Sequence, residues 1–182
     1  KGVGLKGGMR EVRTLVYLLM GFVSFREDGV SRRTNYLLRK ARDRAHVLVG
    51  LAIAVANIDE VINLIRRAPD PQTAREQLME RRWPAKDVEG LISLIDAPRH
   101  RINEDLTYNL SEEQARAILE LRLARLTALG RDEIDDELNK IGEEIKDYLD
   151  ILSSRLRIMT IVKDELCAIR DEFGTPRRTE IA

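Results

Sequence analysis

The most constraining feature of this sequence is a regular apolar seam that runs from Arg131 to Phe173 through a stretch without proline. Apolar residues recur along it at a mean spacing of about 3.5 positions, the heptad period of a left-handed coiled coil. The seam consists of Ile134, Leu138, Ile141, Ile145, Tyr148, Leu152, Leu156, Met159, Val162, Leu166, Ile169 and Phe173. We therefore predict one long helix over residues 131–174, followed by a tail at 175–182. Gly142 and the Ser153–Ser154 pair are points where that helix can bend.

A helix with one long apolar seam needs a partner, and the stretch from Val30 to Arg67 supplies one. Its apolar and small residues also recur in steps of three and four, and Pro69 and Pro71 end the pattern. We predict a long N-terminal helix within residues 1–69. Residues 1–68 hold 13 basic and 6 acidic residues, a net charge of +7, whereas residues 131–173 hold 7 and 13, a net of −6. Opposite charge and the turn of the chain between the helices predict an antiparallel pair.

The residues between these two helices, 70–130, predict a small helical knob with Trp83 in its core. Asp70 fits the N-cap of one helix, with Pro71 in its first turn. Ser111 and Gln114 have the spacing of a capping box at the start of another. The predicted fold class is all-α, a long antiparallel coiled coil capped by a small globular helical knob that dimerises.

The helix that begins at Ser111 has two apolar faces. One face holds Ala115, Ile118, Leu119, Leu123 and Leu126, and the other holds Ala117, Leu121, Ala124 and Ala128. One face can pack on the helix's own domain, so the other has to be covered as well. The pattern alone leaves open whether that second surface is core or a dimer contact.

Composition and motifs exclude several classes of function. Aromatic residues are 4% and charged residues 34% of the chain, which is typical of long helices. The single cysteine, Cys167, excludes an internal disulfide and suits a reducing cytosol, and the two histidines offer no zinc-binding spacing. No apolar run is long enough to span a bilayer. We find no catalytic, cofactor-binding or metal-binding constellation within the chain.

The strongest basic cluster lies in the first long helix and consists of Arg32, Arg33, Arg39, Lys40 and Arg44. It can approach a DNA backbone, where each neutralised phosphate adds salt-dependent affinity. The alternative is a solvated coiled-coil face that pairs with the acidic helix. We favour the alternative, since aromatic residues for base stacking are absent from the cluster.

Three blocks of sequence resemble the family of bacterial DNA gyrase A subunits, in that family's order and spacing. Residues 31–71 read SRRTNYLLRKARDRAHVLVGLAIAVANIDEVINLIRRAPDP, residues 108–134 read YNLSEEQARAILELRLARLTALGRDEI, and residues 161–181 read IVKDELCAIRDEFGTPRRTEI. The blocks extend over about 150 residues. The KARDRAH and ANIDEVI segments look more like gyrase than topoisomerase IV.

The resemblance implies a part of a type II topoisomerase, which cuts one duplex, passes another through it and reseals it, using ATP on its B subunit. The A subunit's coiled coils carry a knob that pairs with its twin to form the exit gate. The helix at Ser111 is similar to the family's gate-dimer helix. This implies a dimer interface formed by Tyr108, Leu110, Gln114, Ala115, Ile118, Leu119, Arg122, Leu123 and Leu126.

The family's catalytic tyrosine lies in an Ala-Arg-Tyr-Thr-Glu context, which this sequence lacks. The resemblance therefore implies a structural and gating fragment that is inactive alone and holds no cofactor, because the parent enzyme uses Mg²⁺ and ATP elsewhere. It implies a homodimer, the gyrase B subunit in an A2B2 enzyme and duplex DNA as partners, in the bacterial cytoplasm and without a membrane. The rival interpretation is a stand-alone coiled-coil tether.

Overall fold

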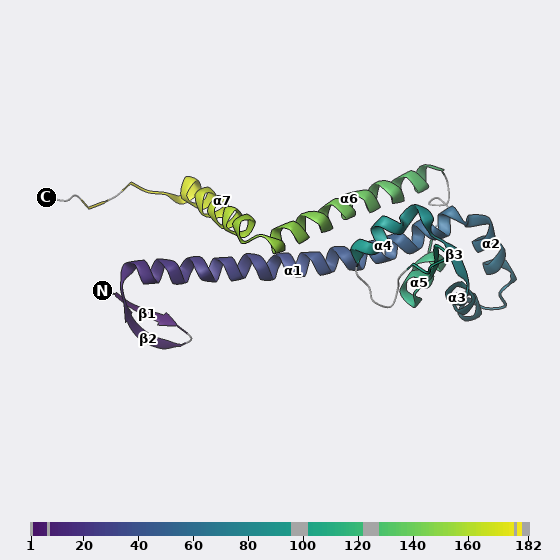
Figure 1. Ribbon diagram of the computed structural model, residues 1–182, viewed down its shortest axis with the longest axis horizontal. Coiled ribbons are helices and arrows are strands. Elements are labelled where there is room, and N and C mark those ends of the chain that lie inside the picture. Colours follow the sequence, from purple (N-terminus) through teal and green to yellow (C-terminus); the bar gives the residue numbers. More distant parts are fainter. Residues whose placement is uncertain (1, 7, 96–101, 122–127, 177, 180–182) are drawn as a thin grey trace. The chain divides into compact units, whose positions relative to one another are not determined.

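The computed structural model describes residues 2–6, 8–95, 102–121, 128–176 and 178–179 (Figure 1). The chain divides into two compact units. Unit 1 combines Lys1–Leu37 with Tyr148–Ala182, and unit 2 is Leu38–Asp147. Long helices dominate both, as the seams predict.

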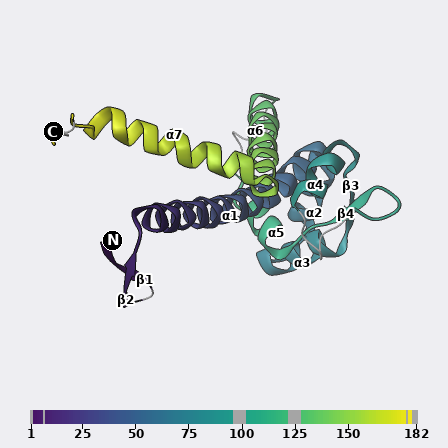
Figure 2. The ribbon, with the colours of Figure 1, turned by 60° about the vertical axis from the view of Figure 1, so that its left-hand side comes forward.

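Unit 1 opens with a β-hairpin rather than a helix. Strands β1 (Gly2–Lys6) and β2 (Met9–Arg13) pair antiparallel, and the pair Lys6↔Met9 closes the turn. Gly8 has φ +84°, which glycine adopts without the steric cost that other residues meet. The hairpin lies beside the start of the following helix, since a Cβ on Gly4 would lie 2.7 Å from Leu18 Cδ2 (Figure 2). The long helix predicted within residues 1–69 begins at Leu15, after this hairpin, and the sequence pattern had left the structure of the opening residues open.

The long helix α1 spans Leu15–Ala56, 42 residues without a break. In unit 1 its first half packs against the end of α6 (Ala128–Ser153) and against α7 (Arg155–Phe173). The shared core consists of Val30, Ile151, Ile158 and Val162, each at most 7% exposed. Tyr148, Ile161 and Leu166 pack onto it. The predicted C-terminal seam is only partly right in this unit, because Ile151 and Ile158 in the core lie outside it. Three members of that seam are instead exposed, namely Leu156, Ile169 and Phe173.

The single helix predicted over 131–174 is two helices, and the break lies at Ser154. This residue has extended backbone angles, φ −126° and ψ 108°, and its side chain accepts a hydrogen bond from the Arg157 N–H. Serine side chains favour such cap positions over helix interiors because they hydrogen-bond to nearby backbone groups. Gly142, the other predicted bend, lies inside α6. The predicted stop is confirmed, since α7 ends at Phe173 and the Gly174 N–H donates to Arg170 O at 2.7 Å.

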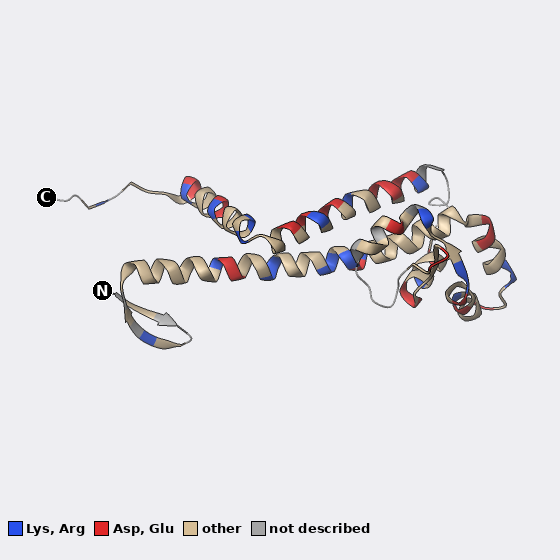
Figure 3. Cartoon of the chain, in the orientation of Figure 1, with Lys and Arg blue, Asp and Glu red and all other residues tan. Residues whose placement is uncertain are grey.

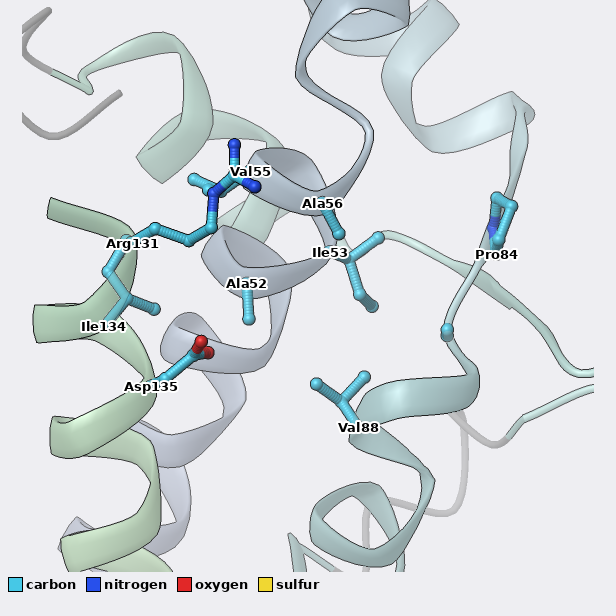
Figure 4. Close-up of a pocket in the computed structure, with 10 residues that line it drawn as sticks. Ala52, Ile53, Val55, Ala56, Pro84, Val88, Arg131, Ile134 and Asp135 are labelled. Carbon is cyan, nitrogen blue, oxygen red and sulfur yellow. The ribbon is translucent and has the colours of Figure 1, made fainter. Parts of the chain in front are cut away.

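In unit 2 the second half of α1 runs antiparallel to α6. Arg44 of α1 pairs with Glu137, and Val55, further along α1, lies beside Arg131, earlier in α6. The two helices and the strand before Val88 border a cleft of about 320 Å³ (Figure 4). Ala52, Val55 and Ile134 give it apolar walls, with Arg131 and Asp135 among its lining residues. The antiparallel pairing predicted from the opposite charges is confirmed in this unit.

The N-terminal helix pattern also contains a break that the apolar spacing does not predict. Helix α2 (Ile58–Arg67) follows α1 after a bend of 91° at Asn57. The Asn57 side-chain amide donates to Ile53 O at 2.8 Å, a local bond that competes with continued helix. The end of α2 before Pro69 agrees with the prediction. No single described helix is long and apolar enough to cross a membrane, and only α1 and α2 meet that criterion together, as this bent pair.

The knob lies around the end of α1 (Figure 1). Its elements are α3 (Pro71–Glu80), β3 (Arg82–Pro84), the 3-10 helix η1 (Lys86–Val88), α4 (Glu89–Ile95), β4 (Thr107–Asn109) and α5 (Glu112–Leu119). The Asp70 cap on α3 is confirmed, with Asp70 Oδ1 accepting from the Thr73 N–H at 2.8 Å. Pro84 ends strand β3, which pairs with β4.

Trp83 is the central side chain of the knob, as predicted. It is fully buried, it lies opposite Tyr108 in the β3–β4 pair, and its Nε1–H donates to Leu78 O at 2.9 Å. The Arg81 guanidinium lies 4.9 Å from the centroid of its ring. A large apolar body with a satisfied N–H makes tryptophan a stable anchor for a core of this size.

Candidate functional site

The nine residues predicted for a dimer interface fall into three groups. Five are buried inside unit 2, each at most 4% exposed, namely Tyr108, Leu110, Gln114, Ala115 and Ile118. Leu119 is partly buried. Arg122, Leu123 and Leu126 lie outside the described residues. The first apolar stripe of α5 thus packs on its own unit, as far as it is described.

Helix α5 begins with the predicted capping box. Ser111 Oγ accepts a hydrogen bond from the Gln114 N–H at 3.2 Å, and Gln114 Oε1 accepts one from the Ser111 N–H at 2.9 Å. The two bonds satisfy donors that a helix start leaves without partners. They also fix the Gln114 side chain in a fully buried position.

Gln114 joins α5 to α1. Its Nε2 donates to the backbone carbonyl of His46 at 2.6 Å and to the Tyr108 hydroxyl oxygen at 3.2 Å. A second link connects the same elements, since His46 Nε2 and Ser111 Oγ lie 2.8 Å apart. Burial raises the pKa of Tyr108, while the bond from Gln114 acts in the opposite direction. Every polar group of this buried cluster named here has a partner, as buried polar groups require.

Gly50 makes this approach possible. A Cβ at Gly50 would lie 2.6 Å from Gln114 Cγ and 2.7 Å from Gln114 Cβ, closer than real Cβ contacts. In the sequence Gly50 stands out only as a lone glycine inside a predicted helix, and we did not predict its role. The position itself could have indicated this role, because a glycine inside a helix lowers stability and is often kept for a packing reason.

Two described residues belong to the second apolar stripe, Ala117 in α5 and Leu121, which follows the end of α5. Ala117 and Leu121 are partly buried, beside the exposed Arg116 and Glu120. A buried side chain has little surface left to offer a partner, so a second copy would meet α5 mainly through this stripe and Leu119. Whether any of these residues contacts a second copy stays a prediction.

The five residues of the basic cluster differ in whether they form ion pairs. Figure 3 shows basic residues along α1 and acidic residues concentrated on α6. Arg33 Nη2 donates to Glu165 Oε1 at 2.5 Å, and Glu165 also pairs with Arg26 at 2.7 Å. Arg44 donates from Nε and Nη2 to Glu137 Oε1, at 2.8 and 2.6 Å. Arg32, Arg39 and Lys40 are exposed. The favoured interpretation, pairing with acidic residues of the later helices, thus describes Arg33 and Arg44.

A catalytic or metal centre finds no support in the described ranges. Among those residues, no group of three or more His, Cys, Asp or Glu side chains is arranged to hold a metal ion. The clusters that the structure does describe are an interhelical polar joint and a basic helix face. Both are features of a scaffold or a binding surface.

Comparison with known proteins identifies the family of the chain. Residues 3–167 match the family of DNA gyrase/topoisomerase IV A subunits. The chain is 51% identical over 179 residues to the DNA gyrase A subunit of Granulibacter bethesdensis, covering 98% of this chain and 19% of the relative. It is 46% identical to the DNA gyrase A subunits of Rickettsia bellii and Rickettsia conorii, again over 179 residues and 98% of this chain, with 20% of each relative covered. The chain thus spans about a fifth of the length of these relatives.

Proposed function

Because the chain belongs to the family of DNA gyrase and topoisomerase IV A subunits, we propose that it forms the coiled-coil arm and exit gate of a bacterial DNA gyrase. The enzyme it serves is a type II topoisomerase, which supercoils DNA by passing one duplex through a break in another. The chain contributes structure and gating and is inactive by itself. Mg²⁺ and ATP act elsewhere in the parent enzyme.

The observation that carries this proposal is the joint between the arm and the knob in unit 2. Gln114 is fully buried and donates to the His46 carbonyl of α1, so α5 is attached to the second half of a long helix. A gate of this kind has to hold two subunits together and still open. A rigid connection between arm and gate helix lets a movement of one reach the other.

The proposed partner at the gate is a second copy of this chain. The proposed contact surface is Ala117 and Leu119 of α5 with Leu121 after it, together with the predicted Arg122, Leu123 and Leu126. Further proposed partners are the gyrase B subunit, in an A2B2 enzyme, and duplex DNA, all in the bacterial cytoplasm. No membrane takes part.

The solution mass of the 182-residue chain across a dilution series tests the gate. The chain has a mass of 20.8 kDa, so a dimer sediments at about 42 kDa. We expect the dimer to persist on dilution into the low micromolar range. A monomer at every concentration contradicts the proposal for this chain.

A second exposed apolar surface, at the start of α1, can also cause association, so the dimer test needs a control variant. The first turns of α1 expose large apolar side chains, with Leu15 71%, Leu19 57% and Phe25 64% exposed. Apolar patches of this kind associate non-specifically. Leu19→Glu with Phe25→Glu therefore serves as the matched control for Ala117→Glu with Leu121→Glu. We expect only the Ala117 and Leu121 substitutions to convert the dimer to monomer. A dimer lost only with the Leu19 and Phe25 substitutions assigns the contact to the apolar patch of α1.

A further inference from the structure

The cleft in unit 2 is a hollow that the packing of α1 against α6 leaves unfilled. Its volume is about 320 Å³, at the lower end of the range of ligand pockets and about twice that of an apolar cavity that holds benzene. All of its lining residues belong to unit 2, so the cleft is formed within one compact unit. The space suits a small molecule of about the size of a substituted ring.

The walls of the cleft are apolar and come from three elements. Ile53 and Val55 of α1 and Ile134 of α6 are each at most 2% exposed, so their side chains are held by their own neighbours. Ala85 and Val88 line the third side, from η1 and the residue before it. An apolar group that enters gains free energy by leaving water, and it meets walls that are already in place.

Two charged side chains of α6 also line the cleft, Arg131 and Asp135. Figure 4 shows both extending from α6 toward α1, on either side of Ile134. Both are exposed, and within the ranges that the structure describes neither has an ion-pair partner. A spacing of four residues places them on one face of the helix, but arginine before an acidic residue is the less favourable order for a pair. The cleft therefore offers one unpaired cation and one unpaired anion beside apolar walls.

The two charges select the class of ligand. Around them the start of α6 is acidic, since residues 131–137 hold five acidic residues and one basic residue. A simple anion would meet Asp135 and these acidic neighbours, and a simple cation would leave Arg131 facing a like charge. A zwitterion satisfies both, with its carboxylate on the Arg131 guanidinium and its ammonium on the Asp135 carboxylate. The Cβ atoms of residues spaced in this way lie about 5–6 Å apart, so both side chains can reach charged groups carried by one carbon.

We propose that the unit 2 cleft binds a free α-amino acid with an apolar side chain. The side chain lies between Val55, Val88 and Ile134, while the charged groups pair with Arg131 and Asp135. Such a ligand contacts α1, η1 and α6 at once, so its binding holds the start of α6 against the knob. Binding here needs neither a dimer nor a gate, so the site goes beyond the proposed function and is tested separately from it.

Nuclear magnetic resonance of the ¹⁵N-labelled 182-residue chain tests the site, with L-phenylalanine as the probe. The amide shifts of residues 52–56, 84–88 and 131–135, which line the cleft, are followed as the probe concentration rises to about 10 mM. Phenethylamine lacks the carboxylate and 3-phenylpropionate lacks the ammonium, so these compounds test each charge of the ligand. Free glycine carries both charges without an apolar side chain, so it tests the walls.

Two substitutions test the charges of the protein. Arg131→Gln and Asp135→Asn each remove one charge from an exposed position, where substitutions change stability little. Lys140→Gln and Asp136→Asn are the matched controls, because they remove the same charges from exposed positions of α6 that do not line the cleft. Far-UV circular dichroism verifies that all four variants keep their helix content.

We expect L-phenylalanine to give saturable shifts confined to the three segments, and each of the other compounds to bind at least about threefold more weakly. Arg131→Gln should weaken L-phenylalanine by about threefold without weakening phenethylamine, and Asp135→Asn should weaken it without weakening 3-phenylpropionate. The control variants should bind as the unmodified chain does. Shifts that do not saturate, or equal losses in test and control variants, overturn the proposal. Phenethylamine that binds as tightly as L-phenylalanine, with no effect of Arg131→Gln, overturns the assigned class in favour of a simple amine.

Discussion

Gly50 of α1 lies close to Gln114 of α5, and its surroundings differ from those of another glycine of the same helix, Gly21. The distance of 2.6 Å from a Gly50 Cβ to Gln114 Cγ leaves no room for a methyl group. At Gly21, in the same helix, nothing lies within 4 Å of a built Cβ. The two glycines share a helix and differ in their surroundings.

We predict that Gly21→Ala stabilises the chain by about 1 kcal/mol, because alanine is the better helix former. Gly50→Ala gains the same propensity but overlaps Gln114, which costs about 1–3 kcal/mol. Its net effect should therefore be neutral or destabilising. Urea unfolding followed by circular dichroism measures both. Equal stabilisation by the two substitutions would show that α5 shifts freely and is not held by the joint.

Asp70 is a residue whose protonation reports on the start of α3. The Thr73 N–H and hydroxyl donate to its carboxylate at 2.8 and 2.7 Å, which lowers its pKa below the ordinary 3.8. A group with a lowered folded pKa contributes stability that is complete above its unfolded pKa. That contribution is lost as the pH falls through the folded pKa.

We predict that the free energy of unfolding of the unmodified chain, relative to that of Asp70→Asn, decreases as the pH falls from 6 to 3. Asparagine caps a helix about as well as aspartate, but it does not titrate. All other carboxylates are common to both chains, so the difference isolates Asp70. Urea unfolding at pH 6, 4.5 and 3 measures it. A pH-independent difference would mean that the Thr73 bonds do not favour the ionised form.

At the scale of secondary-structure elements, Ser111 starts α5 and also links it to α1. Its side chain caps the helix and lies 2.8 Å from His46 Nε2. Ser93 in α4 offers a comparison, since it is exposed and its hydroxyl donates only to the nearby Gly90 carbonyl. Comparing substitutions at the two serines separates the stability that the contact with α1 contributes from that of a local hydrogen bond.

We predict that Ser111→Ala costs about 1–2 kcal/mol and Ser93→Ala less than about 0.5 kcal/mol. The cost at Ser111 combines a lost cap with a His46 nitrogen left without this partner. Chemical unfolding of both variants gives the comparison. Equal small costs would contradict the role of Ser111 in the joint.

These elements also show what sequence can and cannot predict. Seams, caps and proline stops depend on neighbours in sequence, so the long helices, the Asp70 cap and the Ser111 capping box were predicted. The breaks at Asn57 and Ser154 depend on side chains that compete with the helix backbone, and only the second was anticipated. The sequence also showed two apolar stripes in the region of α5, but not the close contact of Gln114 with Gly50, because the two residues are distant in sequence.

At the scale of the whole molecule, each unit has its own core. Unit 1 depends on Val30, Ile151, Ile158 and Val162. Unit 2 depends on a core around the fully buried Trp83, which is the only tryptophan in the chain. Tryptophan fluorescence therefore follows unit 2, whereas far-UV circular dichroism follows the helices of both units. The two signals allow the units to be observed separately.

We predict that Ile158→Ala lowers the stability of unit 1 by about 2–4 kcal/mol, because it removes a buried aliphatic group at the crossing of α1 and α7. The dichroism midpoint in urea should fall clearly, while the tryptophan midpoint moves much less. Leu78→Ala, beside Trp83, is the matched substitution in unit 2 and should shift the tryptophan midpoint strongly. If Ile158→Ala instead moves both midpoints together, α1 transmits stability from one unit to the other. The chain would then unfold as one cooperative body, and an exit gate built from it would open only with its arm.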